Sequence, residues 1–578
     1  MKTAVLLISI LLAFAVAQGC APKSNPSSGQ VTSPAATMSP LVAATPEPRK
    51  LTAEEQTALS EFAGFAGTRV TPDKFQAHMK EVQAKASEYT TKFPLVGGDQ
   101  WDFLVVQAAF ANGQYADALT ASDAFIAKYP DSAQLEQVMM LRGYSLFSTK
   151  QYDLAAQQYY AVTEQFPDSA NLPLAMYNCG ANYYMAQKMD EAVEMLEEEL
   201  LARFPDCPWS PSAHQILALI ADTDGDASRA AMHLWAFLLN NQNYLAMNNE
   251  RNRKVGDLVE KLASAAQTVE DKMNCAAMRM LYYSKAYDTV SRKLANPDAY
   301  SSSAEELGKL LEKSGNAPFA IGPAYVYTDF VLSQGDTKTA WPLIEKWSAV
   351  ASGAYASKFF VLKLTAFLYD DRYEEVLKTI DAAPEELRMD PDALNFAAMA
   401  AMNLDRYDVA VKYCSLGLKV KPNDQNFAQT IKTCGLVGKL APEIAGIDLL
   451  TGKPVKLSDL RGKVVLIDFW ATWCGPCRGE LPNVVAVYEK YGAKGFEILG
   501  VSLDQENMAD AVKKFCEAQK MPWPQIYEGK YWNVTPRPAY QFNAIPFTVL
   551  VDKEGYIRKV NKRGDALDPA VAEMLGIK

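Results

Sequence analysis

The stretch from Lys463 to Pro482 constrains the fold of this 578-residue chain more than any other. It opens with four consecutive aliphatic residues, Val464 to Ile467, which are typical of a parallel strand buried on both faces. A short turn and the sequence CGPC follow, and an amphipathic helical pattern continues beyond them. The segment therefore predicts a buried strand, a tight turn, and a helix that carries two cysteines in its first turn.

The position of Cys474 and Cys477 at a helix N-terminus has a chemical consequence. The N-terminus of a helix stabilises negative charge, so a thiol there ionises more easily, and the thiolate is the form that attacks a disulfide. We expect Cys474 to lie at the exposed helix N-terminus and to act as the nucleophile. Cys477, one turn further on and more buried, is expected to resolve the mixed disulfide. Gly475 and Pro476 allow the tight entry into the helix and help to set the redox potential.

Two other functions of a CxxC pair fit this sequence poorly. A structural zinc site needs about four ligands, but from Gly446 onward the chain offers only Cys516 as a third cysteine, and no histidine. Haem attachment requires a histidine directly after the second cysteine, where this chain has Arg478. We therefore expect thiol-disulfide redox chemistry, no metal and no other cofactor, with Cys516 in a structural role.

The segment resembles the thioredoxin superfamily, in which WCGPC is the active-site motif. Asp468, six residues before Cys474, matches the buried carboxylate of that family, and Pro482 matches its helix kink. Ile545-Pro546 matches its cis-proline loop. The framing sequences RGKVVLIDFWATWC and EILGVSLD resemble the extracytoplasmic TlpA/ResA-type thiol-disulfide oxidoreductases. The resemblance covers about the last quarter of the chain. It implies an α/β fold with a central mixed sheet, protein disulfides as substrates, and a thiol/disulfide electron donor.

The same segment suggests roles for individual residues. Asp468 interrupts an apolar strand, where burial should raise its pKa and make it a proton acceptor for Cys477 near neutral pH. The alternative is a solvated carboxylate at the end of the strand. Trp473 is expected to contact substrate at the rim of the site, with plain packing as the alternative. The resemblance places the Ile545 backbone beside the disulfide, where an extended substrate can pair with it. The expected substrate-binding set is Trp473, Gly475, Pro476, Ile545 and Pro546.

The N-terminal residues resemble an export signal. A positive start precedes an apolar run of 13 residues, Ala4 to Val16, which is short for a membrane span and fits the core of a signal peptide. Ala15-Val16-Ala17 matches a signal-peptidase site, whereas the segment from Ala17 to Cys20 resembles a bacterial lipobox, with alanine where leucine is usual. We favour a signal peptide over residues 1–19 and lipidation of Cys20, because a lone cysteine there is followed by a Pro/Ser/Thr/Ala-rich tether. That tether, residues 20–48, is expected to be disordered. The protein would then lie in the bacterial cell envelope or periplasm, lipid-anchored to a membrane.

Internal repeats follow from about Leu51. The motifs GQYADA, QYDLA and KMDEA recur at a period of 37 to 38 residues, and each precedes a helix that ends in a Tyr/Phe-Pro-Asp sequence. Such a period indicates stacked helical hairpins. It resembles tetratricopeptide repeats, and Gly143, Ala155, Tyr159 and Pro167 fall at the small, small, aromatic and proline positions of that family. Small residues let two helices touch, and proline ends the second helix.

A second repeat block places the related segments 371–375 and 405–409 at a distance of 34 residues. Between about 243 and 320 the repeat signature fades while helical periodicity persists. We predict an all-α tetratricopeptide-like solenoid over 49–240, further helical repeats over 241–435, and a thioredoxin-like domain over 436–578. Two separate solenoid segments are the alternative. Solenoids form elongated concave surfaces, so the repeats are expected to bind a partner or substrate protein, with a spacer or scaffold as the other interpretation.

Composition narrows the function further. The 57 basic and 68 acidic residues give a net charge of −11, which does not suggest nucleic-acid binding. Nine scattered cysteines are too few for a disulfide-rich scaffold, and those in the helical region are expected to fill cores. We predict an extracytoplasmic disulfide reductase of proteins; the alternative is an envelope scaffold with an accessory redox module. A thiol peroxidase would need a lone cysteine preceded by Pro and Thr, which WCGPC does not match.

Overall fold

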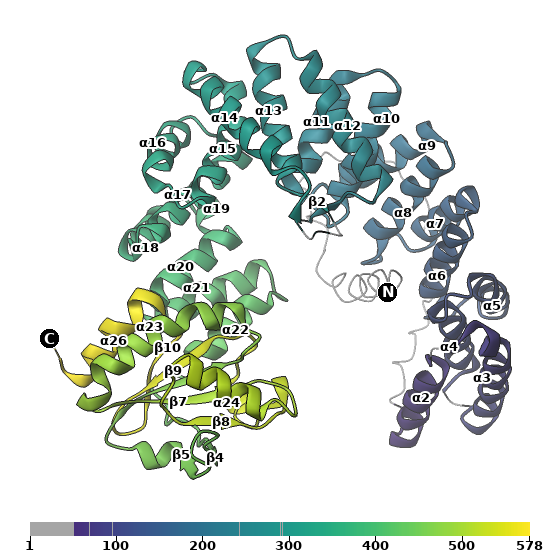
Figure 1. Cartoon of the computed structure of the whole chain (residues 1–578). Helices are drawn as coiled ribbons and strands as arrows, with labels where there is room; N and C mark the ends of the chain where they lie inside the picture. Colours follow the sequence, from purple (N-terminus) through teal and green to yellow (C-terminus); the bar gives the residue numbers. More distant parts are fainter. Residues whose placement is uncertain are drawn as a thin grey trace, which may run out of the picture. The chain divides into compact units, whose positions relative to one another are not determined.

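The computed structural model describes residues 51–577, apart from 69, 95, 242, 289–290 and 292. The predicted signal peptide, Cys20 and the tether lie outside the described residues. The chain is divided into two compact units, of which the first ends at Glu306 and the second begins at Leu307 (Figure 1). Of the residues described, none forms a helix long and apolar enough to span a bilayer.

The first unit consists mainly of helices that pack against their neighbours in the sequence. Its helices are α2 (Ala53–Ala66), α3 (Pro72–Lys92), α4 (Gly98–Ala111), α5 (Tyr115–Lys128), α6 (Leu135–Ser148), α7 (Tyr152–Gln165), α8 (Leu172–Met185), α9 (Met189–Val193), the π-helix η2 (Glu194–Leu201), α10 (Ser210–Thr223), α11 (Ala227–Asn240), α12 (Glu250–Ala265) and α13 (Val269–Tyr283), and α14 (Pro297–Lys313) continues into the second unit.

The predicted repeat is confirmed by two structural features of these helices. The turn inside successive hairpins uses a left-handed residue at the same place, with φ of 72° at Gly113, 63° at Lys150 and 64° at Gln187. Close helix packing requires the predicted small residue, since a Cβ atom at Gly143 would lie 2.7 Å from the ring of Tyr159. The sequence period therefore corresponds to a repeated pair of closely packed helices.

The helical repeats predicted over 241–435 are interrupted at one place. A small sheet with the order β1-β2-β3 joins β1 (Leu245–Ala246), β2 (Ala286–Asp288) and β3 (Lys293–Leu294). Leu245 and Ala286, which are paired in this sheet, are 4% and 1% exposed. These apolar residues lie outside helices, so their backbone groups satisfy one another across strands instead.

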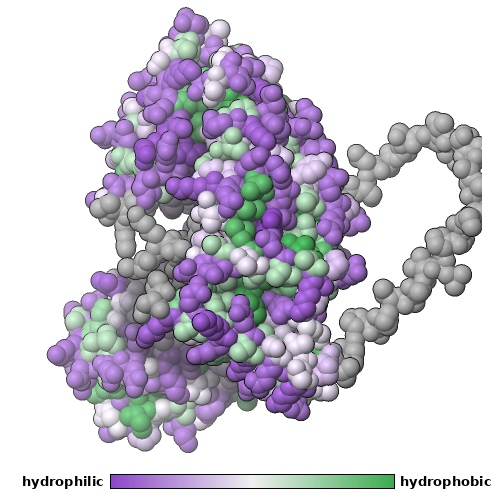
Figure 2. Space-filling model, turned by 90° about the vertical axis from the view of Figure 1, so that its right-hand side faces the viewer, coloured by the Kyte–Doolittle hydropathy of each residue, from purple (hydrophilic) through white to green (hydrophobic). Residues whose placement is uncertain are grey.

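Hydrophobic side chains on the surface are scattered. Figure 2 shows a face that is mostly hydrophilic, on which hydrophobic residues gather in a few small groups. On α7, for example, Leu154 and Tyr160 are 50% and 46% exposed.

The second unit begins with further helices and ends with the predicted α/β domain. The helices before the domain are the 3₁₀ turn η3 (Pro318–Ala320), α15 (Ile321–Ser333), α16 (Thr337–Ser348), α17 (Ala354–Tyr369), α18 (Tyr373–Ala382), α19 (Glu385–Arg388), α20 (Pro391–Asn403), α21 (Tyr407–Val420) and α22 (Gln425–Cys434).

A five-stranded sheet with the order β10-β9-β6-β7-β8 forms the centre of the α/β domain. Its elements are the hairpin β4 (Ala445–Ile447) and β5 (Pro454–Lys456), η4 (Leu457–Leu460), β6 (Val464–Trp470), α23 (Gly475–Tyr491), η5 (Gly492–Lys494), β7 (Phe496–Ser502), α24 (Ala509–Ala518), β8 (Gln525–Tyr527), η6 (Tyr531–Asn533), α25 (Arg537–Tyr540), β9 (Phe547–Val551), β10 (Ile557–Val560), η7 (Gly564–Ala566) and α26 (Leu567–Leu575). Strand β6 is buried along its whole length, parallel to β7 and antiparallel to β9. The predicted mixed sheet is confirmed.

Charged groups fasten the last helical repeat to the α/β domain. Asp405, in the turn between α20 and α21, accepts hydrogen bonds from Lys559 Nζ at 2.6 Å and Lys562 Nζ at 2.9 Å. Lys562 Nζ also donates to the carbonyl of Asn403 at 2.9 Å, and the hydroxyl of Tyr407 accepts from the Val560 N–H at 3.3 Å. Both lysines are buried, so each needs these partners to compensate for lost hydration.

Replacing Asp405 with Asn should loosen this contact, because two buried ammonium groups lose their shared carboxylate. We expect a local loss of about 2 kcal/mol, the usual value of hydrogen bonds to charged groups. The measurement is hydrogen–deuterium exchange of α21 and β10 at pH 7, with Asp408→Asn, an exposed position on α21, as the matched control. Unchanged exchange in Asp405→Asn would contradict a stabilising role.

The contact should also depend on pH. Burial opposes ionisation of Asp405, but hydrogen bonds from Lys559 and Lys562 outweigh it, so the pKa of this carboxyl lies below its ordinary value. The stabilisation is therefore complete above the ordinary carboxyl pKa and is lost as pH falls through the lowered pKa. Wild type and Asp405→Asn should differ in exchange at pH 7 and converge in strong acid.

Candidate active site

The site is built where β6 ends and α23 begins. Cys474 is the N-cap residue of α23, and its Sγ accepts a hydrogen bond from the Cys477 N–H at 3.1 Å. The two cysteines form a disulfide across the first turn. Gly475 and Pro476 lie on the surface between them. A backbone N–H directed at Cys474 Sγ would stabilise a thiolate on this sulfur in the reduced protein.

The expectation that Cys474 is exposed is wrong for this disulfide form. Cys474 is 5% exposed and Cys477 is 3% exposed, so the two residues differ little in burial. The reason is the capping geometry, which turns the Cys474 side chain back over the first turn of the helix toward the Cys477 N–H. What distinguishes the two sulfurs is therefore the N-cap hydrogen bond and not solvent exposure.

Asp468 lies in the middle of β6, opposite Gly500 on β7 and Thr548 on β9. It is 5% exposed, so the alternative of a solvated carboxylate at a strand end is wrong. Burial raises the pKa of Asp468 to about 7, with a further increase from Glu480 and an opposing effect from Arg563. A carboxyl with this pKa exchanges protons near neutral pH.

Glu480 is a site residue that the sequence interpretation missed. Its Oε1 accepts hydrogen bonds from the Gly564 N–H and from Asn483 Nδ2, both at 2.7 Å. It therefore ties α23 to the segment after β10 and brings a second carboxylate near Asp468. Its spacing, three residues after Cys477 on the same helix, was the signal that could have identified it.

Asp504 is a second residue to which the sequence interpretation gave no role. It is fully buried, two residues after the end of β7, where it accepts hydrogen bonds from the Thr472 N–H at 3.1 Å and from the Ser502 hydroxyl at 2.8 Å. The Thr472 hydroxyl donates to the same carboxylate. These bonds fix the turn that precedes Cys474. An acidic residue that follows an apolar strand was visible in the sequence, but its partner was not.

The Ile545–Pro546 peptide bond is cis, as the resemblance implied. The Pro546 carbonyl accepts a hydrogen bond from Arg563 Nη1 at 3.4 Å. Within the described part of the chain, the backbone groups of residues 543–545 make no hydrogen bond. They are free to pair with an extended peptide.

An aromatic cluster borders the first turn of α23. Trp473 is 46% exposed, and its ring centroid lies 5.3 Å from that of Tyr531 and 6.3 Å from that of Trp532. Tyr531, at 39% exposed, was not predicted as a site residue. A side chain placed only for packing would be more covered, so the exposure of Trp473 favours its predicted place at the rim.

The remaining cysteines do not add to this site. Cys516 is fully buried, and burial raises the pKa of its thiol to about 12, so it stays protonated at neutral pH. The other free cysteines within the described residues are buried as well, as expected of core fillers. Among the residues that the structure describes, no group of three or more His, Cys, Asp or Glu side chains is arranged to bind a metal ion.

Comparisons with known proteins agree with this geometry. Residues 437–560 match the AhpC/TSA family, and residues 106–170 match a tetratricopeptide repeat. The thiol-disulfide oxidoreductase ResA of Geobacillus kaustophilus is 35% identical over 131 residues, which cover 23% of this chain and 72% of the relative. ResA of Bacillus anthracis is 37% identical over 122 residues, which cover 21% of this chain and 66% of the relative.

Solved structures are also similar in sequence to part of this chain. The thioredoxin domain of a thiol-disulfide oxidoreductase from Bacteroides vulgatus is 38% identical, with 24% of this chain and 97% of that chain covered and a TM-score of 0.23. A DsbE thiol:disulfide interchange protein from Chlorobium tepidum is 34% identical, with 24% and 98% covered and a TM-score of 0.22. Since this chain covers 72% of the Geobacillus relative at 35% identity, it belongs to the ResA family of thiol-disulfide oxidoreductases.

Proposed function

We propose that this thiol-disulfide oxidoreductase reduces disulfides of protein substrates outside the cytoplasm. The observation that carries the proposal is the Cys474–Cys477 pair on the first turn of α23, with a backbone N–H at Cys474 Sγ and the buried Asp468 on the preceding strand. A WCGPC pair in thioredoxin has a potential of roughly −270 mV, which is reducing. The alternative is an envelope scaffold in which the redox domain is accessory.

The proposed reaction starts from the reduced pair. The Cys474 thiolate attacks one sulfur of the substrate disulfide, forms a mixed disulfide and releases the other substrate sulfur as a thiolate. Asp468 takes the proton of Cys477, whose thiolate attacks Cys474 Sγ. The substrate leaves with its second thiol, and the enzyme retains the disulfide seen here. An external dithiol restores the reduced pair by the same exchange.

We also propose the substrate contacts and the domain limits. Trp473, Gly475 and Pro476 would contact the substrate beside the reacting sulfurs, and Ile545 and Pro546 would pair with its backbone. The repeats at 49–240 and 241–435 would bind the partner or substrate protein, and 436–578 would perform the chemistry. The signal peptide over 1–19, lipidation of Cys20 and the tether over 20–48 would place the protein at a membrane of the bacterial envelope.

Replacement of Asp468 by Asn should slow the resolving step. In the wild type the rate should rise with pH through about 7, because only the ionised carboxyl accepts a proton. The Asn variant should lack this rise and be about 100-fold slower at pH 8, the lower end of general-base effects. The measurement is single-turnover decay of the mixed disulfide from pH 5.5 to 9, with the exposed Asp459→Asn as control. Superimposable profiles for Asp468→Asn and wild type would reject the role.

Stability offers an independent check on the same carboxyl. Its folded pKa of about 7 lies above the ordinary value of 3.8, so folding favours the protonated form. The stabilisation that this pKa difference gives to the folded state is complete below pH 3.8 and is lost as pH rises toward 7. The Asn variant, which cannot ionise, should therefore gain thermal stability relative to wild type above pH 7.

Cysteine variants should separate the two thiols and test the repeats. Cys477→Ser should accumulate mixed disulfides on Cys474, whereas Cys474→Ser should trap far fewer substrates.

Removal of residues 51–296 from the Cys477→Ser protein retains the helices that contact the α/β domain. It should change the set of trapped proteins, because tethering by the repeats raises the local substrate concentration. Mass spectrometry of the trapped species gives the result. Equal partner sets and yields would favour the spacer or scaffold interpretation.

Cys20→Ser should move the protein from the membrane fraction to the soluble fraction if Cys20 carries the lipid. Fractionation of cells that express either form, followed by immunoblotting, makes the comparison. A membrane-bound pool of the same size in the variant would contradict lipidation.

A further inference from the structure

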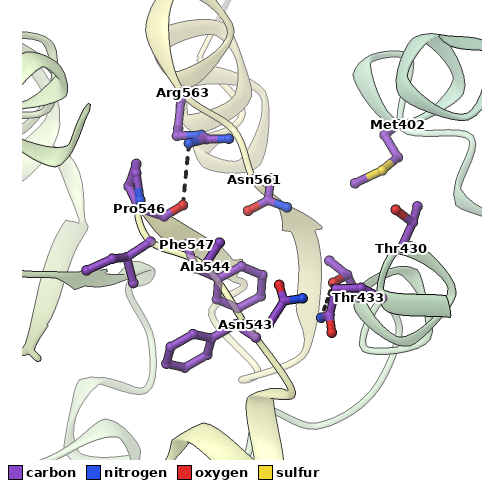
Figure 3. Close-up of a pocket in the computed structure, with 12 residues that line it drawn as sticks. Met402, Thr430, Thr433, Asn543, Ala544, Pro546, Phe547, Asn561 and Arg563 are labelled. Carbon is purple, nitrogen blue, oxygen red and sulfur yellow. Dashed lines mark hydrogen bonds between the residues drawn. The ribbon is translucent and has the colours of Figure 1, made fainter. Parts of the chain in front are cut away.

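A cavity of about 200 Å³ lies beside the cis proline in the second unit (Figure 3). Two parts of the chain form its walls. The α/β domain contributes residues 542–547 with Asn561 and Arg563, and the last helical repeat contributes Met402, Gln429, Thr430 and Thr433. Figure 3 shows Thr430 and Thr433 across the cavity from Pro546 and Arg563.

The cavity adjoins the redox site. Arg563 donates to the Pro546 carbonyl, and the next residue, Gly564, donates its N–H to Glu480 on the helix that carries both cysteines. The charges of Arg563 and Glu480 both act on the ionisation of Asp468. A substrate segment that pairs with residues 543–545 would therefore pass along this cavity while its cysteine reacts.

The wall from the last repeat is held in place by specific contacts. Lys562 follows the cavity residue Asn561 in the chain. Its Nζ donates to the Met402 carbonyl at 3.3 Å and to the Asp405 carboxylate at 2.9 Å. Gln429 Nε2 donates to the Gln541 carbonyl, just before the loop that carries the cis proline. Because polar groups of α20 and α22 bond directly to the segments on either side of the cavity, the wall is a fixed part of the site.

The chemistry of the lining favours a particular occupant. The residues that line the cavity include one guanidinium, from Arg563, and no carboxylate. Hydroxyls and carboxamides of Thr430, Thr433, Asn543 and Asn561 add neutral hydrogen-bonding groups beside the apolar side chains of the lining. A cationic side chain would find no counter-charge among these residues, whereas a carboxylate would face the guanidinium and hydroxyl donors.

We propose that the last helical repeat, as one wall of this cavity, helps to select the substrates of the disulfide exchange. The cavity accepts an acidic side chain close to the cysteine of an extended protein substrate. This inference rests on the proposed function. The repeat region would then select substrates at the active site itself through Thr430 and Thr433, and not only by tethering at a distance. Neither threonine takes part in the redox steps, so the wall can be changed without altering the chemistry.

The test uses short peptides with one cysteine, present as its disulfide with 5-thio-2-nitrobenzoate. The residues two before and two after the cysteine, which lie on the cysteine side of an extended chain, are both Glu, both Gln or both Lys. The mixed disulfide of 2-mercaptoethanol with the same chromophore measures the reaction without a peptide. Pre-reduced full-length protein is mixed with each, and release of the coloured thiolate gives the second-order rate constant of the single turnover.

Wild type should react at least tenfold faster with the Glu peptide than with the Lys peptide. Thr430→Glu places a carboxylate in the cavity wall and should lower this ratio at least tenfold. The matched control Gln425→Glu adds the same charge to an exposed position of α22 outside the cavity lining and should retain the wild-type ratio. All three proteins should react equally with the mercaptoethanol compound, which also shows that each variant is folded.

If the mercaptoethanol reaction proceeds, equal rates of wild type with the three peptides, or an unchanged Glu-to-Lys ratio in Thr430→Glu, would overturn the proposed selection by the last repeat. Equal changes in Thr430→Glu and Gln425→Glu would mean that general surface charge, not the cavity, sets the preference, and would overturn it as well. Failure of wild type to react with the mercaptoethanol compound would instead reject the proposed function, and this inference with it.

Discussion

The hydrogen bond from the Cys477 N–H to Cys474 Sγ is the interaction on which the site depends. This hydrogen bond forms because β6, which is buried on both faces, ends at a short turn, and α23 begins directly after that turn with Cys474 as its N-cap residue. Asp504 holds that turn through Thr472, so the capping sulfur has one defined position at the helix N-terminus. The same strand carries Asp468, whose burial raises its pKa into the range where thiols and carboxyls exchange protons. One strand and one helix therefore carry the two cysteines, the N–H at the capping sulfur, and the carboxyl that we propose as the proton acceptor.

The contact between the last repeat and the α/β domain gives the helices of this repeat a structural role beside the proposed binding of partner proteins. Buried lysines of β10 and the segment after it bond to Asp405 and to the end of α20. Such buried charges stabilise only when every partner is present, so they fix the relative position of the two surfaces. As a result, α22 borders the cis-proline loop and forms one wall of the cavity that we propose as part of the substrate site.

Local patterns made much of this fold predictable. Unbroken apolar residues defined β6, and the spacing of the turn motifs gave the repeats, because both arise from periodicity along the chain. The burial of Cys474 was not predictable, since it results from a capping sulfur whose side-chain direction is a three-dimensional property. Glu480 and Asp504 were missed because their partners, Gly564 and Thr472, are remote in sequence. The wall of Thr430 and Thr433 was missed for the same reason: nothing in α22 shows what it faces.

The central claim is that Cys474 reduces protein disulfides, and insulin reduction tests it most directly. Full-length protein, kept reduced by dithiothreitol, is added to insulin, and precipitation of the freed B chain is followed by turbidity. The account predicts rapid precipitation with wild type and the uncatalysed rate with Cys474→Ser. Wild-type protein that leaves the uncatalysed rate unchanged, or a Cys474→Ser variant as active as wild type, would contradict it.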